Sequence, residues 1–191
     1  FFIFLLRFFI HTGRIFYIIS KSEIQTKTGF TYVISSEKIN PFSFFKLIFF
    51  NTQHLDNQDF EQVLKHEKIH ASQLHSFDLL LAELMTIVFW FNPVAWLLNR
   101  FIRQNLEYIA DAEVLKTGVP KKNYQYQLLS VSVPDYSSRL TNHFNHSLLK
   151  NRIAMMNVKK SSRQQKRKYL LFLPVLFGLF VFLNHSNAQI I

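Results

Sequence analysis

The spacing of apolar residues along the chain predicts two helices in its middle part. Residues 56–78 place apolar side chains at the three- and four-residue intervals of an amphipathic helix, and Asp59 can cap its start. The apolar stripe of this helix consists of Phe60, Val63, Leu64 and Ile69. A second helix is predicted for residues 94–116, because the helix-ending residues Gly118 and Pro120 follow it.

Residues 30–50, "FTYVISSEKINPFSFFKLIFF", follow a different pattern. They are rich in β-branched and aromatic residues and are interrupted at Asn40 and Pro41. This composition predicts two short strands joined by a turn. With the helices on either side, we expect an α+β fold that is mainly helical.

The longest apolar run, residues 79–99, is "LLLAELMTIVFWFNPVAWLLN". It has the length of a membrane span, but proline blocks a helix interior and disfavours the helical conformation of the residue before it, here Asn92. Residues 79–91 would then form a helix about 20 Å long, too short to cross a bilayer. We therefore expect a buried or membrane-dipping helical hairpin that turns at Asn92 and Pro93. The alternative is a single membrane span.

The first segment, residues 1–20, is apolar but contains Arg7, His11 and Arg14, each of which is costly at the centre of a bilayer. It is interpreted as the inner end of a truncated membrane helix that continues into an interfacial segment, with an amphipathic helix outside the membrane as the alternative. Because the chain starts at Phe1 inside an apolar run, we expect it to be part of a longer, multi-pass protein.

The last part of the chain has the pattern of a membrane anchor. A basic linker, residues 150–168, precedes a charge-free apolar run that predicts a transmembrane helix at 169–184, and residues 185–191 form a short tail. Positive residues stay on the cytoplasmic side of membranes. The domain formed by residues 21–149 is therefore expected in the cytoplasm and the tail outside.

Composition supports a membrane protein and argues against a nucleic-acid binder. The chain combines 49% hydrophobic residues and 22 Phe with a formal net charge of +10. Its Lys and Arg residues crowd beside the apolar runs instead of spreading along a groove, so we expect the lipid bilayer as a partner and no nucleic acid. The absence of cysteine excludes thiolate ligands, so any metal site must use His and carboxylates.

The stretch "LKHEKIHASQLH", residues 64–75, contains candidate metal ligands. His66 and His70 are four residues apart, so a helix stacks them on one face, where both can bind one ion. Glu67 lies on the adjoining face and can reach a water in the open coordination position. The pattern fits metal-assisted hydrolysis with Glu67 as the general base, and the alternative is a pair of surface histidines without a metal.

A third ligand must come from further along the chain. The longer zincin motif is excluded, because Gln73 and Ser76 stand where it requires Gly and His. The carboxylates that follow are Glu83, Glu107, Asp111 and Glu113. Glu83 is too near in sequence to fold back easily. Glu107 and Asp111 share one helical face, so Glu107 can bind the metal while Asp111 orients a ligand histidine. The alternative is a solvated acidic face with Glu107 paired to Arg103.

Taken in order, "PFSFF", "HEKIH", "FWFNPVAWLLNR", "EYIAD" and the final apolar anchor resemble the M56 membrane metallopeptidases, the group that includes the sensor-transducers of β-lactam resistance. The resemblance covers about residues 25–184. It implies a gluzincin-like zinc metallopeptidase domain with membrane-embedded helices. It also implies that His66, His70 and Glu107 bind Zn²⁺, that Glu67 is the general base, and that Asp111 supports a ligand.

The resemblance further implies a membrane-bound zinc endopeptidase that cleaves a protein substrate at the cytoplasmic face, in signal transduction such as antibiotic sensing. The expected location is the bacterial cytoplasmic (inner) membrane, with the active site in the cytoplasm. A non-catalytic zinc-containing sensor or transducer is the alternative. The earlier membrane helices and the exterior domain of the family are not part of this sequence, so the inducing signal stays open.

Two further expectations concern the substrate. It is a protein or peptide, and the chain's own linker "VKKSSRQQKRK", residues 158–168, is one candidate because its polar composition leaves it accessible. The candidates for the hydrogen-bond donor to the reacting carbonyl oxygen are Tyr108, His143, His146 and His75. Of these, His75 is five residues beyond His70 and is expected to point away from the ligand face, in a packing role.

Overall fold

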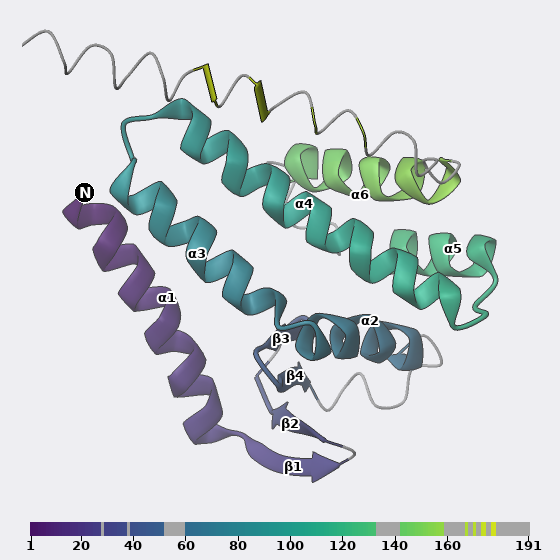
Figure 1. Cartoon of the computed structure of the whole chain (residues 1–191). Helices are drawn as coiled ribbons and strands as arrows, with labels where there is room; N and C mark the ends of the chain where they lie inside the picture. Colours follow the sequence, from purple (N-terminus) through teal and green to yellow (C-terminus); the bar gives the residue numbers. More distant parts are fainter. Residues whose placement is uncertain are drawn as a thin grey trace, which may run out of the picture. The chain divides into compact units, whose positions relative to one another are not determined.

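The computed structural model describes residues 1–27, 29–37, 39–51, 60–132 and 142–158, and the isolated positions 167, 170, 173, 174, 177 and 178. The chain divides into two compact units, residues 1–156 and 157–191. The predicted transmembrane helix at 169–184, the tail at 185–191 and most of the linker beyond Val158 lie outside the described residues. The described part is mainly helical with one small sheet, so the predicted α+β class is confirmed (Figure 1).

Helix α1 (Phe2–Lys21) is one continuous helix over the segment in which a membrane helix was expected to continue into an interfacial one. Among the described residues it is the one helix long and apolar enough to cross a membrane, which is weak support for membrane association. Arg7 and His11 line one cavity, and His11 and Arg14 line a second one, although all three are exposed residues.

The sheet contains four strands in the order β1-β2-β4-β3. These are β1 (Glu23–Lys27), β2 (Phe30–Ser35), β3 (Phe42–Phe44) and β4 (Leu47–Asn51). The central pair, β2 and β4, is parallel, while the outer pairs are antiparallel. Two strands with a turn at Asn40 and Pro41 were predicted. Strand β1 was missed because it is a polar edge strand, and a tight turn at Phe45 divides the second predicted strand in two.

The two faces of the sheet pack against different helices, as the two-residue period of a strand requires. On one face, Val33 and Phe49 pack with Ile18 of α1. On the other face, Tyr32, Ile48 and Phe50 pack with Ala71, and α2 covers them with partly buried apolar residues. The sheet therefore holds α1 and α2 on its opposite sides.

Helices α2 (Phe60–Ser72) and α3 (His75–Val88) replace the single helix predicted for residues 56–78. That prediction was wrong at Leu74, which has the left-handed φ of 55° and ends the regular helical course. A leucine gives no local signal for this conformation, since glycine is the residue that adopts it without strain. The predicted start of the helix, including the Asp59 cap, lies outside the described residues.

Helices α3 and α4 (Pro93–Lys116) form an antiparallel hairpin, with the turn where the sequence predicts it (Figure 1). The Asn92 side chain caps α4 by accepting a hydrogen bond of 2.9 Å from the Val94 amide, and Pro93 occupies the first turn. Gly118 follows the end of α4 with a φ of 87°, as expected for a helix stop. Residues 79–99 are therefore two helices and not one continuous span.

Helices α5 (Lys121–Ser132) and α6 (Asn142–Asn157) complete the described unit. Residues 150–157 were expected at the start of a basic linker, but they form the last turns of α6. The first eight residues of the expected linker are therefore helical.

Candidate metal centre

The candidate ligands come from two helices that pack against each other, α2 and α4. His66 and His70 are stacked on α2, and Glu107 lies on α4. The Nε2 atoms of the two histidines are 3.1 Å apart. The Glu107 carboxylate faces both, with Oε2 3.3 Å from His66 Nε2 and Oε1 3.8 Å from His70 Nε2.

These three side chains fit one metal ion. Their candidate ligand atoms all lie within 4.8 Å of one another. Donor atoms held about 2.0–2.2 Å from a tetrahedral ion lie roughly 3.3 Å apart, close to the distances found between these side chains. Two imidazole nitrogens and one carboxylate oxygen also leave a position for water, as catalytic sites require. The predicted grouping of His66, His70 and Glu107 is therefore present in the structure.

The other ring nitrogen of His66 is held by buried polar groups. Tyr124, on α5, donates a hydrogen bond of 2.8 Å from its hydroxyl to Asp111 Oδ1, and its oxygen lies 3.0 Å from His66 Nδ1. Asp111 Oδ1 is itself 3.4 Å from His66 Nδ1. Since the tyrosine proton goes to Asp111, His66 Nδ1 is the donor to the tyrosine oxygen. The lone pair of His66 Nε2 is then free for a metal ion.

His70 is oriented in a similar way by His75, which is a correction to the expectation that His75 points away. His75 Nδ1 lies 2.7 Å from His70 Nδ1, and His75 Nε2 lies 3.0 Å from the amide oxygen of Gln73. The amide oxygen can only accept, so His75 donates from Nε2 and accepts at Nδ1 the proton of His70. The break at Leu74 causes the difference, because a five-residue spacing points away only on a continuous helix.

The guanidinium of Arg152, on α6, supplies a positive charge beside the candidate ligands. Its guanidinium binds Asp111 through two nitrogens, at 2.9 Å to Oδ2 and 2.6 Å to Oδ1. A third nitrogen lies 3.0 Å from Glu107 Oε2. Arginine suits this position because its planar fork matches a carboxylate. The alternative pairing of Glu107 with Arg103 does not form, since Arg103 binds Glu83 at 2.9 Å.

Glu67 is a partly buried carboxylate beside the ligands. Burial raises its pKa, and this effect outweighs the opposing influence of His66, Ser43 and Arg152. Ser43 is the central residue of strand β3 and of the sequence "PFSFF". The strand therefore holds the candidate base next to the candidate ligands.

The electrostatic environment keeps the ligands in the protonation states that a metal requires. Burial, aided by the neighbouring His66, lowers the pKa of His70 to about 3, so the imidazole stays neutral. Burial alone would raise the pKa of Glu107, but the neighbouring His66 and the charge of Arg152 lower it to about 2. A neutral imidazole and an ionised carboxylate are therefore present together at neutral pH.

The remaining candidates from the sequence lie elsewhere. Glu83 is engaged by Arg103 and Asn99, and Glu113 pairs with Lys116, so neither joins the ligand group. Tyr108 accepts a hydrogen bond from Gln104 on its own helix. The side chains of His143 and His146 lie outside the described residues.

Three residues of the site were not identified from the sequence: Ser43, Tyr124 and Arg152. Ser43 stands inside "PFSFF", a motif that had been noted without a role for the serine. Tyr124 and Arg152 carried no local signal, because they lie 58 and 41 residues from the groups that they contact, His66 and Asp111. Only the packing of α5 and α6 brings them into the site.

The described part of the chain is a mainly helical domain in which His66, His70 and Glu107 could together hold a metal ion. Comparison with protein families matches residues 47–156 to the family described as BlaR1 peptidase M56, over more than half of the chain. The chain belongs to the M56 peptidase family, whose members are metallopeptidases. A comparison with curated proteins found no match.

Replacing Tyr124 by Phe should weaken metal binding without removing a ligand. The change deletes the hydroxyl between His66 and Asp111, and loss of such a supporting group lowers metal affinity by about tenfold to a hundredfold. Competition between the chain and a fluorescent chelator for Zn²⁺ measures the effect. The matched control is Tyr126→Phe on the same helix, since Tyr126 is 71% exposed. Equal affinities for both variants would show that the hydroxyl does not orient the ligand.

Replacing Arg152 by Met should destabilise the metal-free chain, because Asp111 is only 1% exposed and would keep a buried charge without its cation. Breaking a buried ion pair in this way costs about 3–5 kcal/mol. Thermal or urea unfolding of the detergent-solubilised chain measures the change. Lys150→Met serves as the control, since Lys150 is an exposed residue of the same helix. An Arg152 variant as stable as this control would contradict the assignment.

Proposed function

We propose that the chain is a membrane-bound zinc endopeptidase of the gluzincin type, which cleaves a protein substrate at the cytoplasmic face in a signalling process. The observation that carries this proposal is the position of Glu67. It is a carboxylate of raised pKa placed next to two histidines and a glutamate that can share one ion. Membership in a peptidase family gives the reaction class.

The donor set favours zinc among the common metal ions. Two histidines and one glutamate form a ligand set that catalytic zinc sites use, whereas calcium and magnesium prefer oxygen donors. When bound by His66, His70 and Glu107, the ion would act as a Lewis acid toward a water molecule and the peptide carbonyl.

The chain's own residues would manage the protons of the reaction. Hydrolysis adds a water across the peptide bond, so one group must take a proton from the water and return it to the leaving amine. Glu67 suits both steps, because desolvation raises its pKa, and a carboxylate that holds a proton more readily can both take it from the water and return it to the amine. Arg152 and Tyr124 would act only on the ligands and on Asp111, by fixing their positions.

Strand β3 offers a place for the substrate backbone. It is an edge strand of the sheet, paired on one side with β4, and its central residue contacts Glu67. Peptides bind to such edges in an extended conformation through main-chain hydrogen bonds. A peptide added to β3 would pass beside the candidate base.

The exposed apolar residues of the described unit support its association with a membrane. The turn of the α3–α4 hairpin exposes Phe89, Trp90, Phe91, Val94 and Trp96. The Phe4 ring of α1 contacts the Trp96 ring at 5.2 Å, so the turn lies at the level of the apolar start of α1. Glu107 is about 20 Å further along α4 from Pro93. The hairpin and α1 can thus enter one lipid layer while the metal centre stays outside it.

Replacing Glu67 by Gln tests the proposed catalysis. Loss of a general base lowers the rate by about a hundredfold to ten-thousandfold, and bound Zn²⁺ should remain because Glu67 is not a ligand. His66→Ala and Glu107→Ala should lose both metal and cleavage. Zinc content and cleavage of a casein-type protein by the detergent-solubilised chain are measured together.

Glu61→Gln is the control for this experiment, since Glu61 is an exposed residue of α2 whose side chain is 76% accessible. If Glu67→Gln cleaved as fast as Glu61→Gln, the proposed base would be wrong. A natural chain that binds zinc but cleaves nothing would instead support the alternative, a non-catalytic transducer.

Single cysteines at Ser72 and Lys116 test the membrane topology, because the chain has no cysteine of its own. Both positions are exposed at helix ends on the side of the metal centre. A reagent confined to the cytoplasm should label both in membrane vesicles or cells. Labelling from opposite sides would mean that residues 79–99 cross the bilayer, and this would rule out the proposed topology.

A further inference from the structure

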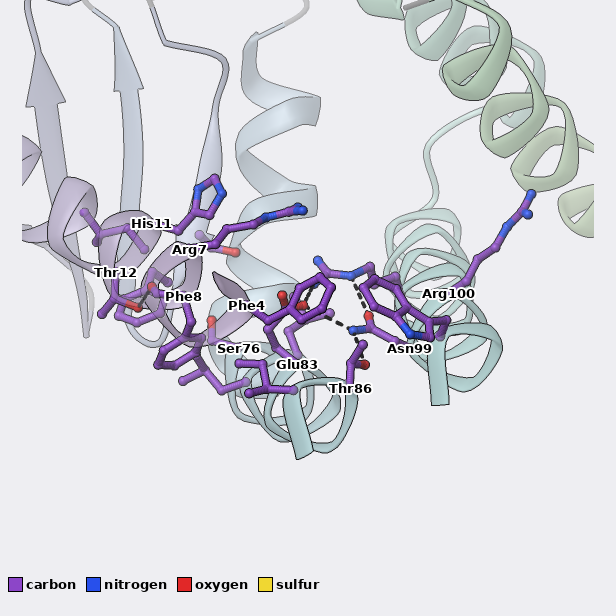
Figure 2. A pocket seen from close by; sticks show the side chains of 18 of the residues that line it. Phe4, Arg7, Phe8, His11, Thr12, Ser76, Glu83, Thr86, Asn99 and Arg100 are labelled. Carbon is purple, nitrogen blue, oxygen red and sulfur yellow. Dashed lines mark hydrogen bonds and ion pairs between the residues drawn. The ribbon is translucent and has the colours of Figure 1, made fainter. Parts of the chain in front are cut away.

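A cavity of about 720 Å³ lies between α1, β3, α3 and α4 (Figure 2). Its volume falls in the range of cavities that hold ligands. Ser43 relates this cavity to the candidate metal centre, because it lines the cavity and is near enough to Glu67 to influence the pKa of that carboxylate. The walls are mainly apolar and include Phe4, Phe8, Ile15, Leu79, Leu80 and Ile87.

The charged residues of the cavity leave an excess of positive charge. Glu83 is the one carboxylate among the described residues that line it, and it is already bound by Arg103 at 2.9 Å and by Asn99 at 3.1 Å. Arg7 and Arg100 also line the cavity, and neither makes an ion pair within the described residues. The cavity is therefore suited to a ligand that is apolar but carries a negative group.

Arg7 is the cation best placed to meet such a group. Figure 2 shows the Arg7 side chain extending from α1 among the residues that line the cavity, whereas the Arg100 side chain extends away from them. The outer face of α1 is apolar, with Phe2, Ile3, Leu6 and Phe9 exposed. A charge in such a helix is costly in lipid, and charges that face a cavity in membrane segments mark functional positions.

The cavity lies where side chains of a peptide bound along β3 could enter it. Side chains of an extended peptide alternate between two sides, so a peptide lying along β3 would direct every second side chain toward one side of the strand. Ser43 and Phe44 of β3 belong to the cavity wall. Residues of the substrate close to the bond beside Glu67 can therefore reach the cavity.

We propose that this cavity is a specificity pocket of the enzyme. It takes bulky apolar side chains of the substrate together with a nearby Asp or Glu, whose carboxylate pairs with Arg7. This proposal rests on the proposed peptidase function and names the substrate class for it. One consequence concerns the basic linker at 158–168, "VKKSSRQQKRK". Its positive charges would be repelled by Arg7, so it would be a poor substrate.

The test compares three peptides of one apolar sequence that differ at a single position near the cleaved bond, which is Asp, Asn or Lys. The linker peptide is the fourth substrate. The zinc-loaded full chain in detergent should show a kcat/KM at least about tenfold higher for Asp than for Lys, with the linker peptide cleaved slowest. Arg7→Gln should bring the Asp-to-Lys ratio near one, and Arg7→Glu should reverse it.

Arg14→Gln is the matched control, because Arg14 lies on the same helix but lines the other cavity. It should keep the preference of the natural chain. A second measurement needs no catalysis: fluorescence anisotropy of the labelled peptides with Glu67→Gln, with and without the Arg7 changes. Binding should follow the same order, Asp before Asn before Lys.

The possible results distinguish a failure of the specificity pocket from a failure of the proposed peptidase function. If the natural chain cleaves peptides without an acidic preference, or if Arg7→Glu leaves the preference unchanged, the specificity pocket is wrong and the peptidase function stands. If nothing is cleaved but Arg7 still controls binding of the Asp peptide, the peptidase function fails and the pocket stands. If Arg7 controls binding of oleate and not of the peptides, the cavity holds a lipid and the proposal is overturned.

Discussion

The described unit depends on one buried carboxylate, that of Asp111. An ionised group out of water is costly unless it is paired and hydrogen-bonded, and Asp111 is only 1% exposed. Its partners come from three other helices: His66 of α2, Tyr124 of α5 and Arg152 of α6. Pairing the Asp111 carboxylate therefore requires α2, α4, α5 and α6 to pack around it. The candidate ligands on α2 and α4 owe their mutual positions to the same set of contacts.

The sequence predicted the parts of the site that follow from the geometry of a single helix. His66 and His70 share a face because four residues make about one turn, and Glu107 and Asp111 do so for the same reason. The turn at Asn92 and Pro93 was also predictable, since proline acts on the backbone locally. Each of these inferences needs only a few consecutive residues.

The parts that could not be predicted depend on contacts between distant segments. Arg152 looked like one more basic residue of a linker, because its partners are far away in the sequence. The reversal at Leu74 had no local sign, and it changed the direction of His75. Strand β1 was missed because an exposed polar edge strand lacks apolar alternation. The charges of α1 were interpreted as costly positions in a membrane helix, and the cavities that these residues line depend on other segments of the chain.

The turn between β3 and β4 ties the two sides of the site together. Phe45 has the left-handed φ of 52°, and its amide donates a hydrogen bond of 2.8 Å to the Ser76 hydroxyl oxygen. Ser76 follows His75, which contacts His70, while Ser43 precedes the turn and contacts Glu67. The candidate base Glu67 and the candidate ligand His70 are thus both connected to the hydrogen bond between Phe45 and Ser76. Under the proposed function, a peptide that binds to the edge strand would displace both groups together, so substrate binding would alter the geometry of the candidate metal ligands.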